Sequence, residues 1–233
     1  MSAARESAPL EIRHATTRLA LHSWRDRVGP PLLLLHALWS DAASLRGVAP
    51  GWSGPVFGLD FSGHGRSAWR EGGVYSPELF AADADIALAE IARESNEPVV
   101  LAGEGVGAYA ALLLAGGRPE CVRAALLAGG RGLAGGGGAP PPEDRSQRFE
   151  KSFRAPMKRA LGDAARGPDP RIEMAEHDPR PPDYAQHFAE RAKHVILVGG
   201  EGEAAPWWEA VASLEKVERV PGDLATALTS YSR

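Results

Sequence analysis

Short apolar runs recur along the chain and are separated by amphipathic or turn-forming segments. The runs are rich in Leu, Val and Ala and contain few polar residues, a pattern typical of strands buried on both faces of a parallel sheet. They lie at residues 32–36, 55–61, 99–103, 122–128 and 194–198. Because helix-type segments separate the runs, the pattern predicts an α/β fold with a mostly parallel sheet and helices on both faces.

Turn and capping signals predict the remaining elements. Residues 16–23 alternate in places between apolar and polar positions and predict an early antiparallel strand. Asp41 suits the N-cap of a short helix that ends near Gly47. Ser76, followed by Pro77 and an acid, predicts the start of a long helix. Further helices are predicted at 148–162, 184–192, 206–214 and 223–231, with a short strand at 217–220.

The stretch PVVLAGEGVGAYAALLLA at residues 98–115 predicts a buried strand, a sharp glycine turn and a helix rich in Ala and Leu. The outer glycines of GEGVG have the spacing of the nucleophile elbow G-x-S-x-G, in its strand–turn–helix context. The central residue here is Gly105, which has no side chain and cannot be a nucleophile. A dinucleotide-binding loop does not fit, because the third glycine comes one residue early and no acid ends the next strand.

Composition narrows the classes of partner. The net charge of −4 argues against a nucleic acid or an anionic membrane as partner. The single cysteine, Cys121, excludes an intrachain disulfide and a multi-thiolate metal site, and we interpret it as a small buried hydrophobe. No group of histidines and acids has the spacing of metal ligands. No apolar window is long enough to span a membrane, and the first residues lack the apolar core of a signal peptide. We therefore expect a cytoplasmic protein with no cofactor and no metal.

Four further motifs accompany the glycine turn: LLLLHALWSDAASL, LDFSGHGRS, HVILVGGEGEAAP and VERVPGDLATALTSY. In this order, from about residue 16 to the end, they resemble the cap-bearing single-domain members of the α/β-hydrolase superfamily. The first is similar to the family's strand-3 His-Gly loop, with Ala37 where glycine is usual. The second is similar to its D-x-x-G-H-G-x-S loop. The resemblance implies an α/β-hydrolase fold with a core at 1–133 and 191–233 and a small cap insertion at 134–190.

The resemblance also assigns the positions of a Ser-His-acid triad, and two of the three roles are missing. The nucleophile position is Gly105, and the acid position is Glu203. The base should follow Pro221-Gly222 within a few residues, but Asp223 and a predicted helix follow at once. No histidine occurs after His194, so the base is absent. Serine-triad hydrolysis is therefore not expected.

The oxyanion hole of the family uses backbone donors, which survive the loss of side chains. They correspond to the amide of Val106, after the nucleophile position, and an amide of the strand-3 loop, here Leu38. With the dipole of the helix behind it, such a notch can hold an anion or a carbonyl. We expect a cavity between the turn and the cap, lined in part by Trp39, Gly105 and Val106, with Glu104 as a candidate residue facing it.

Gly105 also relieves backbone strain. The elbow holds its central residue in a conformation that costs a residue with a side chain about 1–3 kcal/mol, and glycine removes most of this cost. Among other candidates, Ser62 and His64 share a loop that is structural in the family, and we interpret His64 and His36 as structural. His177 and His187 lie in the predicted cap within potential reach of a pocket, and we interpret them as solvated surface residues.

Three functions remain open at this point. The one we favour is a catalytically degenerate member of the fold that binds a small apolar ligand or a protein partner. The second is a lyase, cyclase or isomerase without a triad, using Glu104, the amide notch or a cap histidine. The third is an ester hydrolase whose catalytic residues are not recognised.

Overall fold

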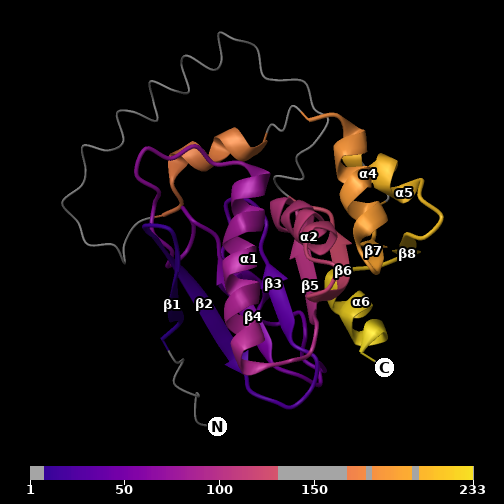
Figure 1. Cartoon of the computed structure of the whole chain (residues 1–233), viewed down its shortest axis with the longest axis horizontal. Helices are drawn as coiled ribbons and strands as arrows, with labels where there is room; N and C mark the ends of the chain where they lie inside the picture. Colours follow the sequence, from indigo (N-terminus) through magenta and orange to yellow (C-terminus); the bar gives the residue numbers. More distant parts are fainter. Residues whose placement is uncertain (1–7, 131–166, 177–179, 201–204, 233) are drawn as a thin grey trace.

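The computed structural model describes residues 8–130, 167–176, 180–200 and 205–232 (Figure 1). At its centre lies an eight-stranded sheet with the order β1-β2-β4-β3-β5-β6-β7-β8. The strands are β1 Leu10–His14, β2 Thr17–Arg25, β3 Leu32–Leu35, β4 Val56–Asp60, β5 Val99–Glu104, β6 Val122–Ala128, β7 Val195–Val198 and β8 Glu218–Val220. β1 and β2 pair antiparallel with each other and β2 with β4, whereas all other neighbours are parallel. The predicted fold class is thereby confirmed.

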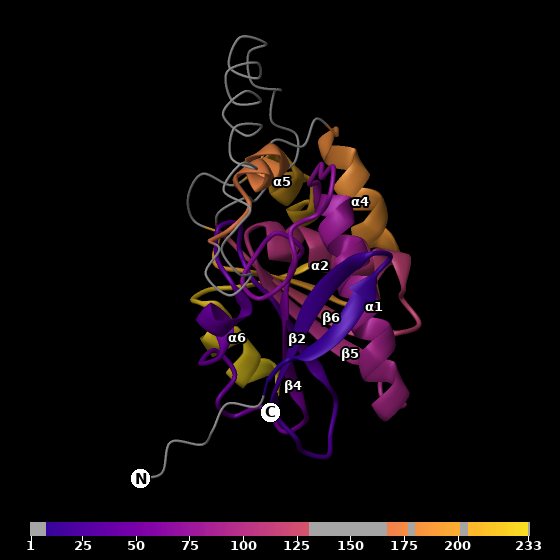
Figure 2. The same cartoon turned by 90° about the vertical axis from the view of Figure 1, so that its left-hand side faces the viewer.

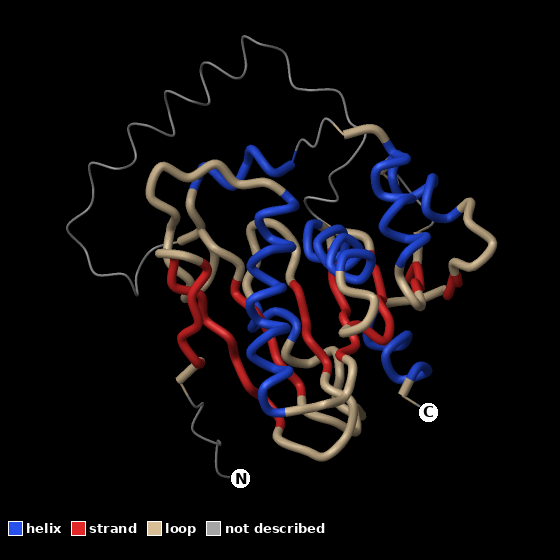
Figure 3. Tube along the Cα trace, in the orientation of Figure 1, coloured by secondary structure: helices blue, strands red, loops and turns tan. Residues whose placement is uncertain are grey.

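Helices cover both faces of this sheet, as Figures 2 and 3 show. They are α1 Pro77–Glu94, α2 Val106–Gly117, α4 Pro182–Arg191, α5 Pro206–Ala212 and α6 Leu224–Tyr231, with the 3-10 helices η1 Ala42–Leu45 and η4 Pro170–Glu176. α1, α2, α4 and α5 share a core with Leu33 and Leu35 of β3. η1 and α6 share a second core with Leu32 and Leu34. Successive residues of a strand point to opposite faces, so the run of four leucines serves both cores.

The predicted helix caps are confirmed by hydrogen bonds. Asp41 accepts a bond from the Ser44 amide at 3.2 Å, and Ser76 accepts one from the Leu79 amide at 3.3 Å. Asp223, which was predicted as the first residue of the last helix, is instead the N-cap of α6, and its carboxylate accepts a bond from the amide of Thr226 at 2.8 Å. Each bond satisfies one of the amides that a helix leaves unpaired at its first turn.

Two described elements were not predicted. β1 carries Leu10 and Ile12 in alternation with charged residues, and Ile12 is buried opposite Leu19 of β2. This alternation is an ordinary strand signal, but it is only five residues long. η4 lies within the predicted cap, of which the structure describes 167–176 and 180–190. The predicted helix at 148–162 lies outside the described residues.

Candidate functional site

The glycine turn between β5 and α2 has the backbone conformation of an elbow. Gly105 is the N-cap of α2, with φ 57° and ψ −123°. Its amide donates to the Ala128 carbonyl at 3.1 Å, and its carbonyl accepts from the amides of Ala108 and Tyr109 at 3.1 and 3.2 Å. The positive φ is a region that glycine enters readily and that strains residues with side chains.

The two outer glycines let α2 approach the sheet closely. A Cβ on Gly103 would lie 2.4 Å from the carbonyl of Gly107. A Cβ on Gly107 would lie 2.2 Å from the Leu35 oxygen and 2.6 Å from the His36 oxygen. The start of α2 therefore abuts the end of β3 and the loop that follows it, with no room for a methyl group.

That loop is held by His36 and carries an unusual residue. The Phe61 amide donates to His36 Nε2 at 3.2 Å, so the proton lies on Nδ1, which donates to the Ala37 carbonyl at 2.8 Å. Burial lowers the pKa of His36, which keeps the imidazole neutral in this role. Trp39 has φ 65°, a left-handed conformation that a bulky residue rarely adopts.

The two predicted amide donors lie on these neighbouring segments. Val106 is the first residue of α2, and Leu38 belongs to the loop after β3. Both side chains are buried, at 0% and 1% exposed. Within the described ranges, neither amide donates a hydrogen bond to another backbone or side-chain group. The N-terminus of α2 adds a partial positive charge behind them.

The loop after β4 is fixed by buried carboxylates. Asp60 accepts hydrogen bonds from the amides of Ala42 and Arg66, both at 2.8 Å, and from His22 Nε2 at 3.0 Å. Burial alone would raise the pKa of Asp60, but these donors outweigh it and the pKa is lowered. In the same loop, His64 Nδ1 donates to the Ser62 carbonyl at 3.1 Å.

A second carboxylate, Asp83 of α1, clamps this loop to the edge of the sheet. It accepts hydrogen bonds from the amide and hydroxyl of Ser62 at 2.9 and 2.6 Å, and it lies 2.6 Å from His14 Nδ1. Sequence reasoning missed both Asp83 and His14. The available signal was an acid at an otherwise apolar position of α1, and Asp83 is fully buried there.

Glu104 ends β5, beside the Gly105 turn, and is half-buried. Burial raises the pKa of its carboxyl, and the negative charge of Asp223 raises it further. Asp223 follows Pro221-Gly222, the point at which the resemblance places the base of the triad. The two carboxyl groups therefore interact at the carboxyl edge of the sheet.

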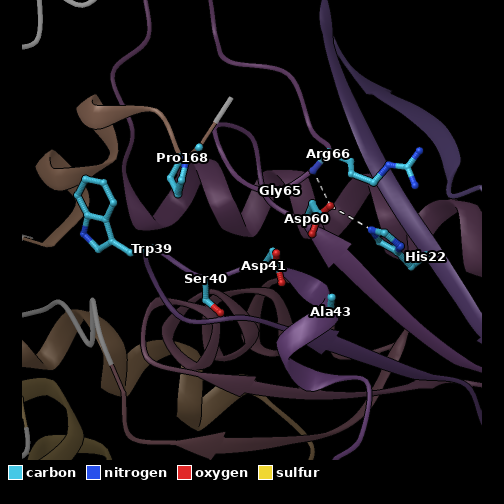
Figure 4. A pocket seen from close by; sticks show the side chains of 10 residues that line it. His22, Trp39, Ser40, Asp41, Ala43, Asp60, Gly65, Arg66 and Pro168 are labelled. Carbon is cyan, nitrogen blue, oxygen red and sulfur yellow. Dashed lines mark hydrogen bonds and ion pairs between the residues drawn. The ribbon is translucent and has the colours of Figure 1, made fainter. Parts of the chain in front are cut away.

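A pocket of about 600 Å³ lies at the carboxyl ends of β3 and β4 (Figure 4). It is lined by His22, Trp39, Ser40, Asp41, Ala43, Asp60, Gly65, Arg66, Gly167 and Pro168. Figure 4 shows Trp39 on one side and the bonded pair of Asp60 and His22 on the other. Of the residues predicted to line a cavity, this pocket includes Trp39 but neither Gly105 nor Val106.

The remaining sequence-predicted candidates are Glu203, His177 and His187. The acid position Glu203 and the cap residue His177 lie outside the described residues. His187 is on α4 with its side chain 72% exposed, 3.8 Å from Glu190. Among the residues that the structure describes, no group of three or more His, Cys, Asp or Glu side chains could hold a metal ion. No helix in the described ranges is long and apolar enough to cross a membrane.

Comparisons with known sequences match part of the chain. A family model described as serine aminopeptidase, S33 (Hydrolase_4) matches residues 49–152. Esterase Rv0045c from Mycobacterium tuberculosis is 34% identical over 93 residues, which are 40% of this chain but only 30% of the esterase.

Solved structures are similar over nearly the whole chain. A thioesterase domain from the curacin biosynthetic pathway covers 96% of each chain with a TM-score of 0.70 and 16% identity. The structure of an esterase from Exiguobacterium antarcticum aligns with 93% of this chain and over 96% of the esterase, with a TM-score of 0.67 and 13% identity. Likeness at these identities shows a shared fold.

Proposed function

We propose that this member of the α/β-hydrolase superfamily, which has the fold of that superfamily, binds a small apolar ligand without hydrolysing it. The ligand would be bound through a carbonyl or carboxylate oxygen. The observation that carries this proposal is Gly105 in the elbow conformation, ahead of a Val106 amide that has no described acceptor. The nucleophilic side chain is missing at Gly105. The Val106 amide, which in a working elbow donates to the substrate's oxyanion, is present. We further propose that the core is 1–133 and 191–233, with 134–190 as its cap.

The supporting chemistry is that of an anion site at a helix N-terminus. Val106 begins a helix of 12 residues that is almost wholly buried, so its amide and dipole act in a poorly solvated environment. Leu38 supplies a second amide from the adjoining loop, which Gly107 brings close to the helix. A carboxylate at this notch would receive two charge-assisted hydrogen bonds, which are among the stronger kind. We propose that the ligand also carries a hydrocarbon tail, because Leu38 and Val106 are themselves apolar and buried.

Removing only the Val106 amide tests the notch. Val106→Pro deletes the N–H at the first helical position, where proline is tolerated. The preceding Gly105, at φ 57° and ψ −123°, has the mirror image of the extended conformation that residues before proline prefer. Losing one hydrogen bond to a charged group should weaken the binding of octanoate, a medium-chain carboxylate, by roughly 10- to 100-fold, measured by isothermal titration calorimetry.

Val106→Ala is the matched control, because it shortens the side chain and keeps the amide. We expect it to bind octanoate within about threefold of the wild type, in keeping with a loss of less than 1 kcal/mol of binding energy. Equal affinity of the proline variant and the wild type would show that the Val106 amide is not the anchor. Native mass spectrometry of the freshly purified protein then tests whether a ligand of this class copurifies with it.

Restoring a hydroxyl should not restore hydrolysis. We expect Gly105→Ser to remain unlabelled by a fluorophosphonate probe, because an unassisted serine is a weak nucleophile and the nucleophile and base of a triad act as a unit. Both Gly105→Ser and Gly105→Ala should lose about 1–3 kcal/mol of stability, since each places a side chain at a positive φ. Fast stoichiometric labelling of the serine variant, and not of the alanine variant, would reveal a base and support the ester-hydrolase alternative.

A second candidate function is favoured by Glu104. Its carboxyl is half-buried with a raised pKa, and in the described part of the chain its side chain makes no hydrogen bond or ion pair. Such a group suits general acid–base chemistry in a lyase, cyclase or isomerase. If a non-hydrolytic turnover is found, its pH profile should lose one limb in Glu104→Gln. Turnover that is unchanged in this variant would exclude Glu104 as the acid or base.

A further inference from the structure

The backbone of Trp39 is held in a left-handed conformation that a tryptophan rarely adopts. Among the described non-glycine residues, only Trp39 and Ala15 have positive φ, and Trp39 is much the larger. The turn that contains it is closed by a single backbone hydrogen bond, from the Ser40 amide to the Ala37 carbonyl at 3.2 Å. A strained residue of this kind persists only where its surroundings hold it in place.

The contact that holds Trp39 comes from a distant part of the chain. Its indole Nε1 donates to Glu176 Oε1 at 2.9 Å, across 137 positions of sequence. Glu176 is the last residue of η4. The indole is also packed, partly buried, against the larger of the two cores. The ring is therefore fixed both by packing and by one directional bond.

η4 is itself anchored at its other end, so it can act as a rigid strut. The Asp169 amide donates to the Gly63 carbonyl at 2.8 Å, and the Asp169 carboxylate accepts from the Tyr75 hydroxyl at 2.9 Å and from Arg171 Nη2 at 2.6 Å. Arg171 Nη2 also donates to the Arg70 carbonyl at 2.9 Å. Asp169 is only 1% exposed, and Ile172 of η4 is fully buried. One end of η4 is thus tied to the loop after β4 and the other to the loop after β3.

We propose that the Trp39–Glu176 hydrogen bond is a latch that sets the position of the Leu38 amide, which makes Trp39 and Glu176 positioning residues for the notch. Leu38 directly precedes Trp39 and lies within the turn that the latch holds. When the bond is lost, the Trp39 backbone relaxes from its left-handed conformation and the turn carries the Leu38 amide away from Val106. This inference rests on the proposed function, in which the two amides bind one oxygen.

Three substitutions separate the latch from general stability. Glu176→Gln keeps a side-chain oxygen that can accept from the indole, Glu176→Leu removes the acceptor, and Trp39→Phe removes the donor. Met174→Ala, at an exposed position of the same 3-10 helix, is the control for a change of side chain in η4. We expect Glu176→Leu and Trp39→Phe to weaken octanoate binding by about tenfold, as for one hydrogen bond to a charged group, with Glu176→Gln and the control within about twofold of the wild type.

A readout that does not depend on the ligand is the amide resonance of Leu38 in ¹H–¹⁵N spectra of the free protein. It should shift in Glu176→Leu and Trp39→Phe and stay in place in Glu176→Gln. An unmoved Leu38 resonance in Glu176→Leu overturns the latch, whatever the affinities. If the wild type fails to bind octanoate while the resonance shifts as expected, the proposed ligand class is wrong and the coupling between η4 and the loop stands.

Discussion

Gly107→Ala will destabilise the domain by about 3 kcal/mol or more, at the upper end of what overpacking costs. The added methyl would lie 2.2 Å from the Leu35 oxygen and 2.6 Å from the His36 oxygen. Both obstacles are backbone atoms, and they belong to the end of β3 and the loop that begins the notch. Neither can turn aside like a flexible side chain, so α2 itself must move away from the sheet. Urea denaturation at neutral pH gives the change in the free energy of unfolding.

Gly117→Ala is the matched control at the other end of the same helix. A Cβ there meets no atom within 4 Å, and its φ is not positive. Alanine is the better helix former, so we expect no loss of stability or a gain of up to about 1 kcal/mol. Equal stability of Gly107→Ala and the wild type would mean that α2 is not seated against β3 as described, and the placement of the Val106 amide would fall with it.

The sequence predicted the elements near the notch because their signals are local. The spacing of glycines in GEGVG, the caps Asp41 and Ser76, and the leucine run of β3 each depend on neighbouring residues only. The conformation of Gly105 followed from the same stretch, and its φ of 57° agrees with the strain argument. Turn glycines, helix caps and buried strands can be predicted from a single sequence because each depends on interactions between residues a few positions apart.

What the sequence could not predict depends on contacts between distant residues. Asp83 meets His14 across 69 positions, and Tyr75 meets Asp169 across 94. Nothing in the neighbourhood of either acid indicates its partner. Trp39 was selected only as a pocket residue, whereas its bond to Glu176 depends on the docking of η4. The pairing of such groups is a property of the folded chain.

The buried acids share one task, which is to fix loops at the carboxyl edge of the sheet. Asp60 holds the loop after β4 to η1, and Asp83 holds the same loop to β1. Asp169 holds η4 to Gly63 and Tyr75, which follow β4. Each buried charge is costly unless it is fully bonded, and these carboxylates have several hydrogen-bond donors each. Their hydrogen bonds therefore fix the geometry of the loops at this edge.

Acidification from about pH 7 to about pH 5 will destabilise the protein by about 2 kcal/mol through His64 alone. Burial lowers the pKa of His64 to about 3, the neighbouring His36 imidazole also disfavours a proton there, and the Ser62 carbonyl and Asp60 only partly oppose this. In the unfolded chain the same imidazole takes a proton near pH 6.5. The unfolded state therefore binds more protons across this range, and acid favours unfolding. Burial lowers the pKa of His36 as well, so its contribution has the same sign.

The slope of the free energy of unfolding against pH, from urea denaturation, measures this effect. Carboxylates with ordinary pKa values remain mostly ionised at about pH 5, so their contribution is small in this range. The chain has seven histidines, so the difference between a variant and the wild type isolates one of them. His64→Gln should flatten the slope by up to about 1.4 kcal/mol per pH unit.

His187→Gln is the control, because that side chain is 72% exposed. This variant should leave the slope unchanged. His64→Gln will also lower the stability at neutral pH to the extent that it disturbs packing against Phe80, whose ring centroid lies 5.6 Å from that of His64. Only the pH dependence, not the absolute stability, reports the buried neutral imidazole. Parallel curves for His64→Gln and the wild type would mean that His64 takes up its proton without unfolding. The loop after β4 would then be open to water and could not support η4 as a rigid strut.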